Sequence, residues 1–194
     1  MIGDDRIAMA LGTVALALVL GALGFQYIGH LAPCEMCHWQ RWPHIAAAII
    51  GLAGIQMGKR HAYAWSAATI LVVTVAGIAV SGQWAVAPYT GAGAMLIAAL
   101  LALAPNRHAA AIAVVALVAV SGLIGLYQTG MQINLLPGPS ACTGLRYTLG
   151  SGAPPPEVSC NAVTWSLFGL SLAAYNAIFS LGAAALGAVL LVKK

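Results

Sequence analysis

Charged side chains are scarce in this chain. Eight Lys and Arg and four Asp and Glu make up 6% of the 194 residues, whereas a soluble domain carries about 25%. This excludes an ordinary soluble protein. The basic residues are scattered, so the net charge of +4 does not indicate a nucleic-acid-binding surface. What is abundant is apolar: 61% of residues are hydrophobic and the mean hydropathy is +0.92, which predicts a bundle of transmembrane helices.

The N-terminus lacks the features of a cleaved signal peptide. Asp4, Asp5 and Arg6 make a poor positive region, and the apolar run over 7–28 is too long for a signal core. It is long enough to span a bilayer at about 1.5 Å per residue. We therefore expect a retained first helix and one integral membrane domain over 1–194, with no separate soluble module.

The fold class predicted is all-α, a polytopic transmembrane bundle. Pro43, near the start of the second span, is tolerable in a first helical turn or as a kink. One long polar segment, 131–163, is expected to form an extracytoplasmic loop. The apolar runs give about six spans, at 7–29, 37–57, 62–85, 88–104, 109–130 and 164–191.

Orientation follows from the placement of Lys and Arg, because cytoplasmic loops carry the excess of positive charge. With cytoplasmic N- and C-termini, only Arg41 and Arg146 fall outside. The other six basic residues then fall inside: Arg6, Lys59, Arg60, Arg107, Lys193 and Lys194. The opposite orientation would reverse this distribution.

All four cysteines lie outside or at the edges of the apolar spans. Four predicted crossings separate the first pair, Cys34 and Cys37, from the second, Cys142 and Cys160. An even number of crossings places both pairs on the same, extracytoplasmic side. In a bacterium this compartment is oxidising, so disulfides form and persist there.

The first pair occurs in "LAPCEMCHWQRWPH" at 31–44. A disulfide across two residues closes too small a loop to stabilise a fold well, and such pairs are typical redox couples. A structural disulfide and a zinc site are the alternatives, although no structural-zinc spacing emerges. Pro33 is a plausible helix starter, which would place Cys37 in a first helical turn, where the helix dipole stabilises a thiolate.

Arg41 lies four residues after Cys37, over the same helical face. A thiolate and a guanidinium at the membrane edge suit an apolar, aromatic, lipid-soluble electron acceptor, and a quinone fits that description. Alternatively, Arg41 reaches lipid phosphate. Trp39 and Trp42 are more typical of an interfacial aromatic belt than of cofactor contacts.

The second pair brackets a Gly- and Pro-rich stretch, "TGLRYTLGSGAPPPEVS". A structural staple is a serious alternative here, because closing a loop of this length is usefully stabilising. The loop has little core to stabilise, however, and exposed disulfides of this kind are typically labile. A redox role for Cys142 and Cys160 is favoured.

Three blocks of the chain resemble the DsbB family of bacterial inner-membrane, quinone-dependent thiol oxidases. "FQYIGHLAPCEMCHWQRWPH" resembles its first periplasmic stretch. "PGPSACTG" resembles the entry to its second periplasmic loop, and "CNAVTWSLFGLSLAAYNAIFSL" its last cysteine and final helix. The blocks cover 50 residues near the two ends of the chain. Together they are specific, whereas the C-x-x-C alone is not.

The resemblance implies a role for each matching residue. Cys34 and Cys37 match the pair nearest the quinone, with Cys37 as the thiolate that contacts the ring. Arg41 matches the arginine that assists the binding and reduction of ubiquinone or menaquinone. Cys142 and Cys160 match the loop pair that reoxidises a periplasmic thioredoxin-fold partner resembling DsbA. The implied location is the inner membrane, with a periplasmic active face and no metal.

The chain departs from the family pattern in two ways. DsbB proteins have four helices, so two more are expected here between the cysteine pairs, at about 62–105. The loop between Cys142 and Cys160 is also short, which leaves little room for the amphipathic helix that members often carry. Some members have a histidine near the position of Gln128, and no role is carried over to Gln128.

Two other functions compete with a thiol:quinone oxidoreductase. A vitamin K epoxide reductase-like oxidase has similar chemistry, but its quinone-side C-x-x-C comes late in the chain, and here it comes first. A non-enzymatic scaffold or small transporter with structural disulfides is the alternative from another class. Transporters tend to carry charged groups at mid-membrane, and the predicted spans contain no buried Asp or Glu.

Overall fold

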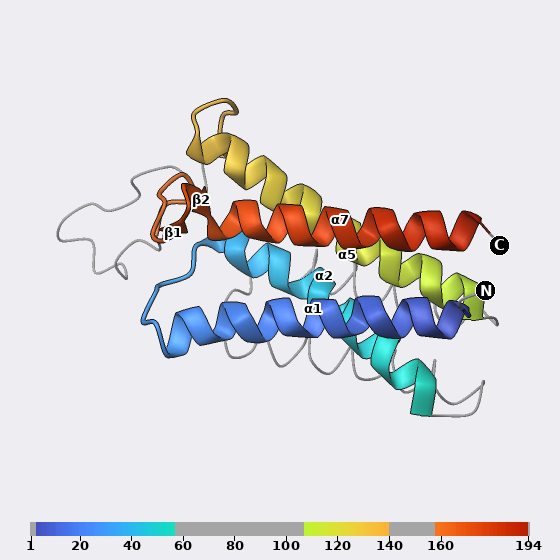
Figure 1. The fold of residues 1–194 in the computed structure, drawn as a ribbon. Helices are drawn as coiled ribbons and strands as arrows, with labels where there is room; N and C mark the ends of the chain where they lie inside the picture. The colour runs from blue at the N-terminus through green and yellow to red at the C-terminus, as the bar shows by residue number, and fades with distance from the viewer. Residues whose placement is uncertain (1–2, 57–106, 140–157, 194) are drawn as a thin grey trace.

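The computed structural model describes residues 3–56, 107–139 and 158–193. The predicted spans at 62–85 and 88–104 lie outside these residues, so the count of six remains a prediction. The described elements are helices and one two-stranded antiparallel hairpin (Figure 1). They are α1 (Asp4–Tyr27), α2 (Glu35–Gln56), α5 (Arg107–Gln132), β1 (Ser166–Leu167), β2 (Leu170–Ser171) and α7 (Leu172–Val192).

Helices lie where the apolar runs at 7–29, 37–57 and 109–130 predict them. The predicted start of the last span, residue 164, is wrong by eight residues, because α7 begins at Leu172. The hairpin occupies the intervening segment, with Phe168 and Gly169 in left-handed backbone conformation at its turn. Ser171 then caps α7, its side chain accepting a hydrogen bond from the Ala174 amide at 3.2 Å. Hydropathy alone does not detect such a turn, because its residues are themselves largely apolar.

Three of the described helices, α1, α5 and α7, are long and apolar enough to cross a membrane. The helix α2 has 22 residues, but its first half carries Glu35, Arg41 and His44. Many large apolar side chains on the three apolar helices are exposed, as expected for surfaces that face lipid. The described part of the chain is therefore an all-α membrane protein with one short hairpin.

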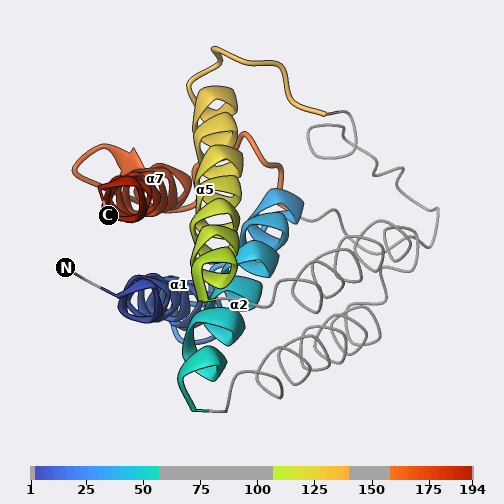
Figure 2. The same cartoon turned by 90° about the vertical axis from the view of Figure 1, so that its right-hand side faces the viewer.

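The helices pack through small side chains. The helix α5 contacts both α7 and α2, and α1 packs mainly against α2 (Figure 2). Ala15, Ala47 and Ala111 are fully buried in the core. Small residues at such contacts let helix backbones approach closely, which is how membrane helices gain packing energy without a hydrophobic driving force.

The two ends of the bundle differ in content. Both chain termini lie at one end (Figure 1), where Arg107 at the start of α5 forms a salt bridge with Asp5 of α1 at 2.9 Å. We call this the terminal end. The opposite, cysteine end contains the start of α2, the end of α5 and the hairpin that precedes α7. Cys34 and Cys160 therefore lie at the same end of the bundle.

Candidate functional site: two cysteine pairs and an apolar cavity

Cys34 and Cys37 form a disulfide at the start of α2. Cys37 is the third residue of this helix, in the first turn as predicted. Its backbone N–H donates a hydrogen bond to Cys34 Sγ at 3.2 Å, so the sulfur occupies the position of a helix cap. The amides of the first helical turn and the positive end of the helix dipole lie at this site. They favour negative charge on sulfur once the disulfide is reduced.

Cys160 packs directly against this disulfide. It is 1% exposed and belongs to a buried cluster with Cys34, Met36 and Met131, with Cys37 at its margin. Cys160 is itself disulfide-bonded, and its predicted partner, Cys142, lies outside the described residues. A cysteine of the second pair is thus brought against the first pair, although Cys37 and Cys160 are 123 positions apart in the sequence.

Gln128 of α5 links the two pairs. Its side chain is 2% exposed. Its Nε2 donates to Cys34 Sγ at 3.2 Å and to the backbone carbonyl of Cys160 at 3.3 Å. Cys37 Sγ lies farther from the same nitrogen, at 3.9 Å. One amide side chain therefore contacts both cysteine pairs.

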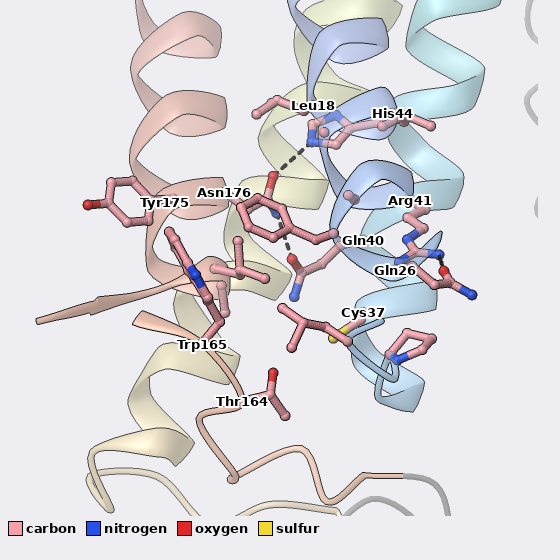
Figure 3. Close-up of a pocket in the computed structure, with 18 of the residues that line it drawn as sticks. Leu18, Gln26, Cys37, Gln40, Arg41, His44, Thr164, Trp165, Tyr175 and Asn176 are labelled. Carbon is pink, nitrogen blue, oxygen red and sulfur yellow. Dashed lines mark hydrogen bonds between the residues drawn. The ribbon is translucent and has the colours of Figure 1, made fainter. Parts of the chain in front are cut away.

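A cavity of about 380 Å³ opens beside Cys37. Figure 3 shows Cys37 and Arg41 of α2 on one side of it, with Trp165 and Asn176 on the other. Such a volume, mostly apolar with a few polar groups, suits a small hydrophobic ligand. The apolar lining includes Leu18, Phe25, Leu31, Trp165, Leu172 and Phe179, and the polar lining includes Gln26, Gln40, Arg41, His44, Gln128 and Asn176.

Arg41 lies on the wall of this cavity, and its guanidinium donates a hydrogen bond to Gln26 of α1. Its Nε atom is buried and has no hydrogen-bond partner among the described residues. The prediction that Arg41 shares a face with Cys37 agrees with this arrangement, since both side chains line the same cavity. Trp39 and Trp42 are absent from the lining.

Three aromatic rings that line the cavity contact one another. Phe25 of α1 and Trp165 lie with their ring centroids 4.9 Å apart, and Trp165 contacts Tyr175 of α7 at 6.3 Å. These contacts join α1, the segment after Cys160 and α7. The Cys160 segment is therefore held over the cavity as well as against Cys34.

Buried amides extend from the cysteines into the bundle. Gln40 Nε2 donates to Gln128 Oε1 at 2.6 Å, and Asn176 Nδ2 donates to Gln40 Oε1 at 2.8 Å. Asn176 Oδ1 in turn contacts His44 Nε2 at 2.9 Å. We call Gln128, Gln40 and Asn176 the amide chain. Sequence reasoning missed it, and the one available signal was that Gln128 and Asn176 interrupt the apolar helices α5 and α7.

Comparisons with known proteins identify a family that the chain matches. The family model described as "Disulfide bond formation protein DsbB" matches residues 4–90 and 87–190. Over 80 residues, 41% of this chain, the chain is 32% identical to disulfide bond formation protein B of Burkholderia thailandensis. It is 31% identical to disulfide bond formation protein B 1 of Pseudomonas fluorescens over the same length.

In both cases the matched part spans about half of the relative, 47% of its length. No solved structure is significantly similar to the chain. The family match nevertheless covers nearly all of the sequence, including Cys34, Cys37, Arg41, Cys142 and Cys160. The chain belongs to the DsbB family of disulfide bond formation proteins.

Proposed function

We propose that the protein is a membrane thiol:quinone oxidoreductase that reoxidises a periplasmic dithiol protein of the thioredoxin fold, similar to DsbA. The observation that carries the proposal is the packing of Cys160 against the Cys34–Cys37 disulfide, with a cavity on the side of Cys37. Disulfide exchange needs sulfurs that can reach one another, and an apolar electron acceptor needs an apolar site beside the last sulfur.

Electrons enter through the second pair in this scheme. A thiolate of the partner attacks Cys142, which breaks the Cys142–Cys160 bond and releases Cys160 as a thiolate. The second thiol of the partner then displaces Cys142 and leaves the partner oxidised. Each step exchanges one sulfur–sulfur bond for another through a mixed disulfide, so no outside oxidant is consumed.

The second pair, now a dithiol, then undergoes disulfide exchange with the first pair. The Cys160 thiolate attacks Cys34, the Cys34–Cys37 bond breaks and Cys37 leaves as a thiolate. Attack of Cys142 on Cys160 restores the second disulfide and releases Cys34. The first pair is now a dithiol, with Cys37 facing the cavity. Its position in the first turn of α2 stabilises the thiolate.

The residues of the cavity fit ubiquinone or menaquinone. A bound quinone supplies a two-electron acceptor that takes up two protons as it is reduced. The apolar lining would hold its ring, and the unpartnered Nε of Arg41 provides a cationic donor for a polar oxygen. The aromatic contacts around Trp165 would exclude water from the site.

An anaerobic assay tests the overall reaction. Purified protein is mixed with a reduced thioredoxin-fold dithiol protein and ubiquinone, and the quinone absorbance is followed. We expect the absorbance to fall only when the protein and the reduced partner are both present. A protein that leaves the quinone oxidised, with menaquinone as well as ubiquinone, would contradict the proposal.

Trapping separates an enzyme from a scaffold or transporter with structural disulfides. In a Cys160→Ala variant, Cys142 is a free thiol. Its thiolate attacks the disulfide of an oxidised thioredoxin-fold partner, which forms a mixed disulfide and releases the partner's second cysteine as a thiolate. We expect this variant to accumulate a covalent complex with a periplasmic thioredoxin-fold protein, detected on non-reducing gels. A Cys142→Ala/Cys160→Ala variant should give no such complex, and a scaffold would give none in either variant.

A further inference from the structure

The direction of the amide chain is fixed by groups that can only accept hydrogen bonds. The carbonyl of Cys160 requires the Nε2 side of Gln128 to face it. The oxygen of Gln128 must then receive the Nε2 of Gln40, whose own oxygen receives the Nδ2 of Asn176. At the far end, Asn176 Nδ2 also donates to the carbonyl of Ser121 at 3.2 Å.

Every amide in the chain therefore donates in the direction of the cysteines. Gln40 donates a hydrogen bond to the side-chain oxygen of Gln128. Gln40 is 8% exposed, and its own oxygen accepts a hydrogen bond from Asn176 of α7. A buried amide with all of its partners in place has little freedom to rotate. Its N–H groups are thus presented to Cys34 Sγ and to Cys160, and they lie closer to Cys34 than to Cys37.

We propose that Gln128 is a positioning residue for disulfide exchange, which holds Cys160 and Cys34 in register so that Cys160 attacks Cys34 rather than Cys37. This inference rests on the proposed function. Gln128 touches the segment that carries the attacking sulfur through the Cys160 carbonyl, and touches the sulfur under attack directly. When Cys34 later leaves as a thiolate, the same N–H group stabilises its charge.

The step to be measured is one exchange within the chain. In a Cys142→Ser background Cys160 is a free thiol, and its thiolate attacks the Cys34–Cys37 disulfide. Attack at Cys34 forms a Cys34–Cys160 bond and releases Cys37. Attack at Cys37 forms a Cys37–Cys160 bond and releases Cys34. Sulfur–sulfur bonds and electrons balance in both cases, and the proton lost by Cys160 is balanced by protonation of the released thiolate.

The experiment prepares this background with the first pair oxidised at low pH and starts exchange by raising the pH. Samples are quenched by alkylation, and mass spectrometry quantifies each disulfide with time. Gln128→Met keeps the length of the side chain but removes its hydrogen bonds. We expect roughly ten-fold slower formation of Cys34–Cys160, and a several-fold lower ratio of Cys34–Cys160 to Cys37–Cys160. A loss of stability alone would not change that ratio.

Two further variants complete the design. Gln40→Met removes the hydrogen bond that orients Gln128 but changes no residue that contacts a sulfur. We expect it to lose rate and selectivity to an intermediate degree. It therefore tests the inference even if Gln128→Met fails to fold. Gln132→Met is the matched control. Gln132 lies one turn further along α5 and bonds the carbonyl of Ala162 at 3.5 Å and Ser171 Oγ at 2.5 Å. Within the described residues, its side chain makes no hydrogen bond to a cysteine. Its selectivity should equal that of the parent.

The outcomes separate this inference from the proposed function. If the Cys142→Ser parent forms no bond between Cys160 and the first pair, the relay itself is wrong. If the parent exchanges but Gln128→Met does so at the same rate and with the same selectivity, only the role of Gln128 is overturned. Equal losses in Gln128→Met and Gln132→Met would also overturn it, because tethering of the loop would then explain both.

Discussion

At the scale of single residues, Cys34 and Cys37 have different surroundings although they are only three positions apart in the sequence. Cys34 is 4% exposed and faces Cys160 and Gln128, whereas Cys37 lines the cavity. In the proposed reaction, this asymmetry suits Cys34 to exchange with the second pair and Cys37 to electron transfer to the acceptor.

We predict that Cys37→Ser abolishes quinone reduction, because no second sulfur remains to form the Cys34–Cys37 disulfide as electrons leave. The variant should still form a bond between Cys34 and Cys160, detectable by non-reducing peptide mapping. Quinone reduction at the wild-type rate by Cys37→Ser would show that Cys37 is not the residue that faces the acceptor.

Arg41→Ala is predicted to raise the apparent KM for quinone. Loss of a hydrogen bond from a charged donor costs about 1.5–3 kcal/mol, which corresponds to roughly a 10- to 100-fold weaker interaction. Arg41→Lys should recover only part of the loss, since Lys lacks the planar fork that reaches Gln26 and a ligand together.

The control for Arg41 is Arg107→Gln. Arg107 is exposed at the terminal end, where it pairs with Asp5. It does not line the cavity. Steady-state assays at limiting quinone should give this variant the wild-type KM. An Arg41→Ala enzyme that matches wild type in the same assay would remove Arg41 from the quinone site.

At the scale of elements, the position of α2 depends on a close contact with α1. A Cβ atom built on Gly12 would lie 2.9 Å from the Cα of Gly51, and one on Gly51 would collide with the carbonyl of Ala8. Two backbones meet at this crossing, so neither side can relax by turning a side chain. The crossing fixes α2, and with it the first cysteine pair, relative to the α1 wall of the cavity.

Gly12→Ala is therefore predicted to destabilise the protein by about 1–3 kcal/mol through overpacking, although alanine is the better helix former. Gly24→Ala, in the same helix, meets no atom within 4 Å, and should be neutral or stabilising by up to about 1 kcal/mol. Thermal unfolding in detergent measures both. A Gly12→Ala protein at least as stable as wild type would show that the helices separate at this point without cost.

At the scale of the whole molecule, most of the described charged residues lie at the opposite end from the sulfurs; Glu35 and Arg41 are at the cysteine end. Arg107 begins α5 and Lys193 follows α7 at the terminal end, whereas Cys34 and Cys160 lie at the cysteine end. The end of α2 and the start of α5 both lie at the terminal end (Figure 1). The predicted spans at 62–85 and 88–104 lie outside the described residues, and their number stays a prediction.

The positive-inside rule then predicts that the cysteine end faces the periplasm. In intact cells treated with a reductant, a membrane-impermeant maleimide should label the native cysteines. A cysteine introduced by Lys193→Cys in a variant without native cysteines should react only after the membrane is permeabilised. The reverse pattern would overturn the orientation, and with it the access of a periplasmic partner.

The sequence by itself indicates the fold class of this protein and the position of its redox site. Scarce charge and long apolar runs determine a membrane helix bundle, because a bilayer tolerates little else. The spacing and flanking residues of Cys34, Cys37 and Arg41 indicate a redox site at a helix start. The distribution of Lys and Arg also predicts the orientation in the membrane, which the cysteine-labelling experiment tests.

The tertiary structure alone decided what surrounds the sulfurs. Gln128 is separated from Gln40 by 88 positions, and Gln40 from Asn176 by 136, so no local pattern indicates that these amides meet. A polar side chain in an apolar helix has to find its partner on another helix, because lipid offers none. Which partner it finds depends on how the helices cross, and here the crossing places one buried amide between two cysteine pairs.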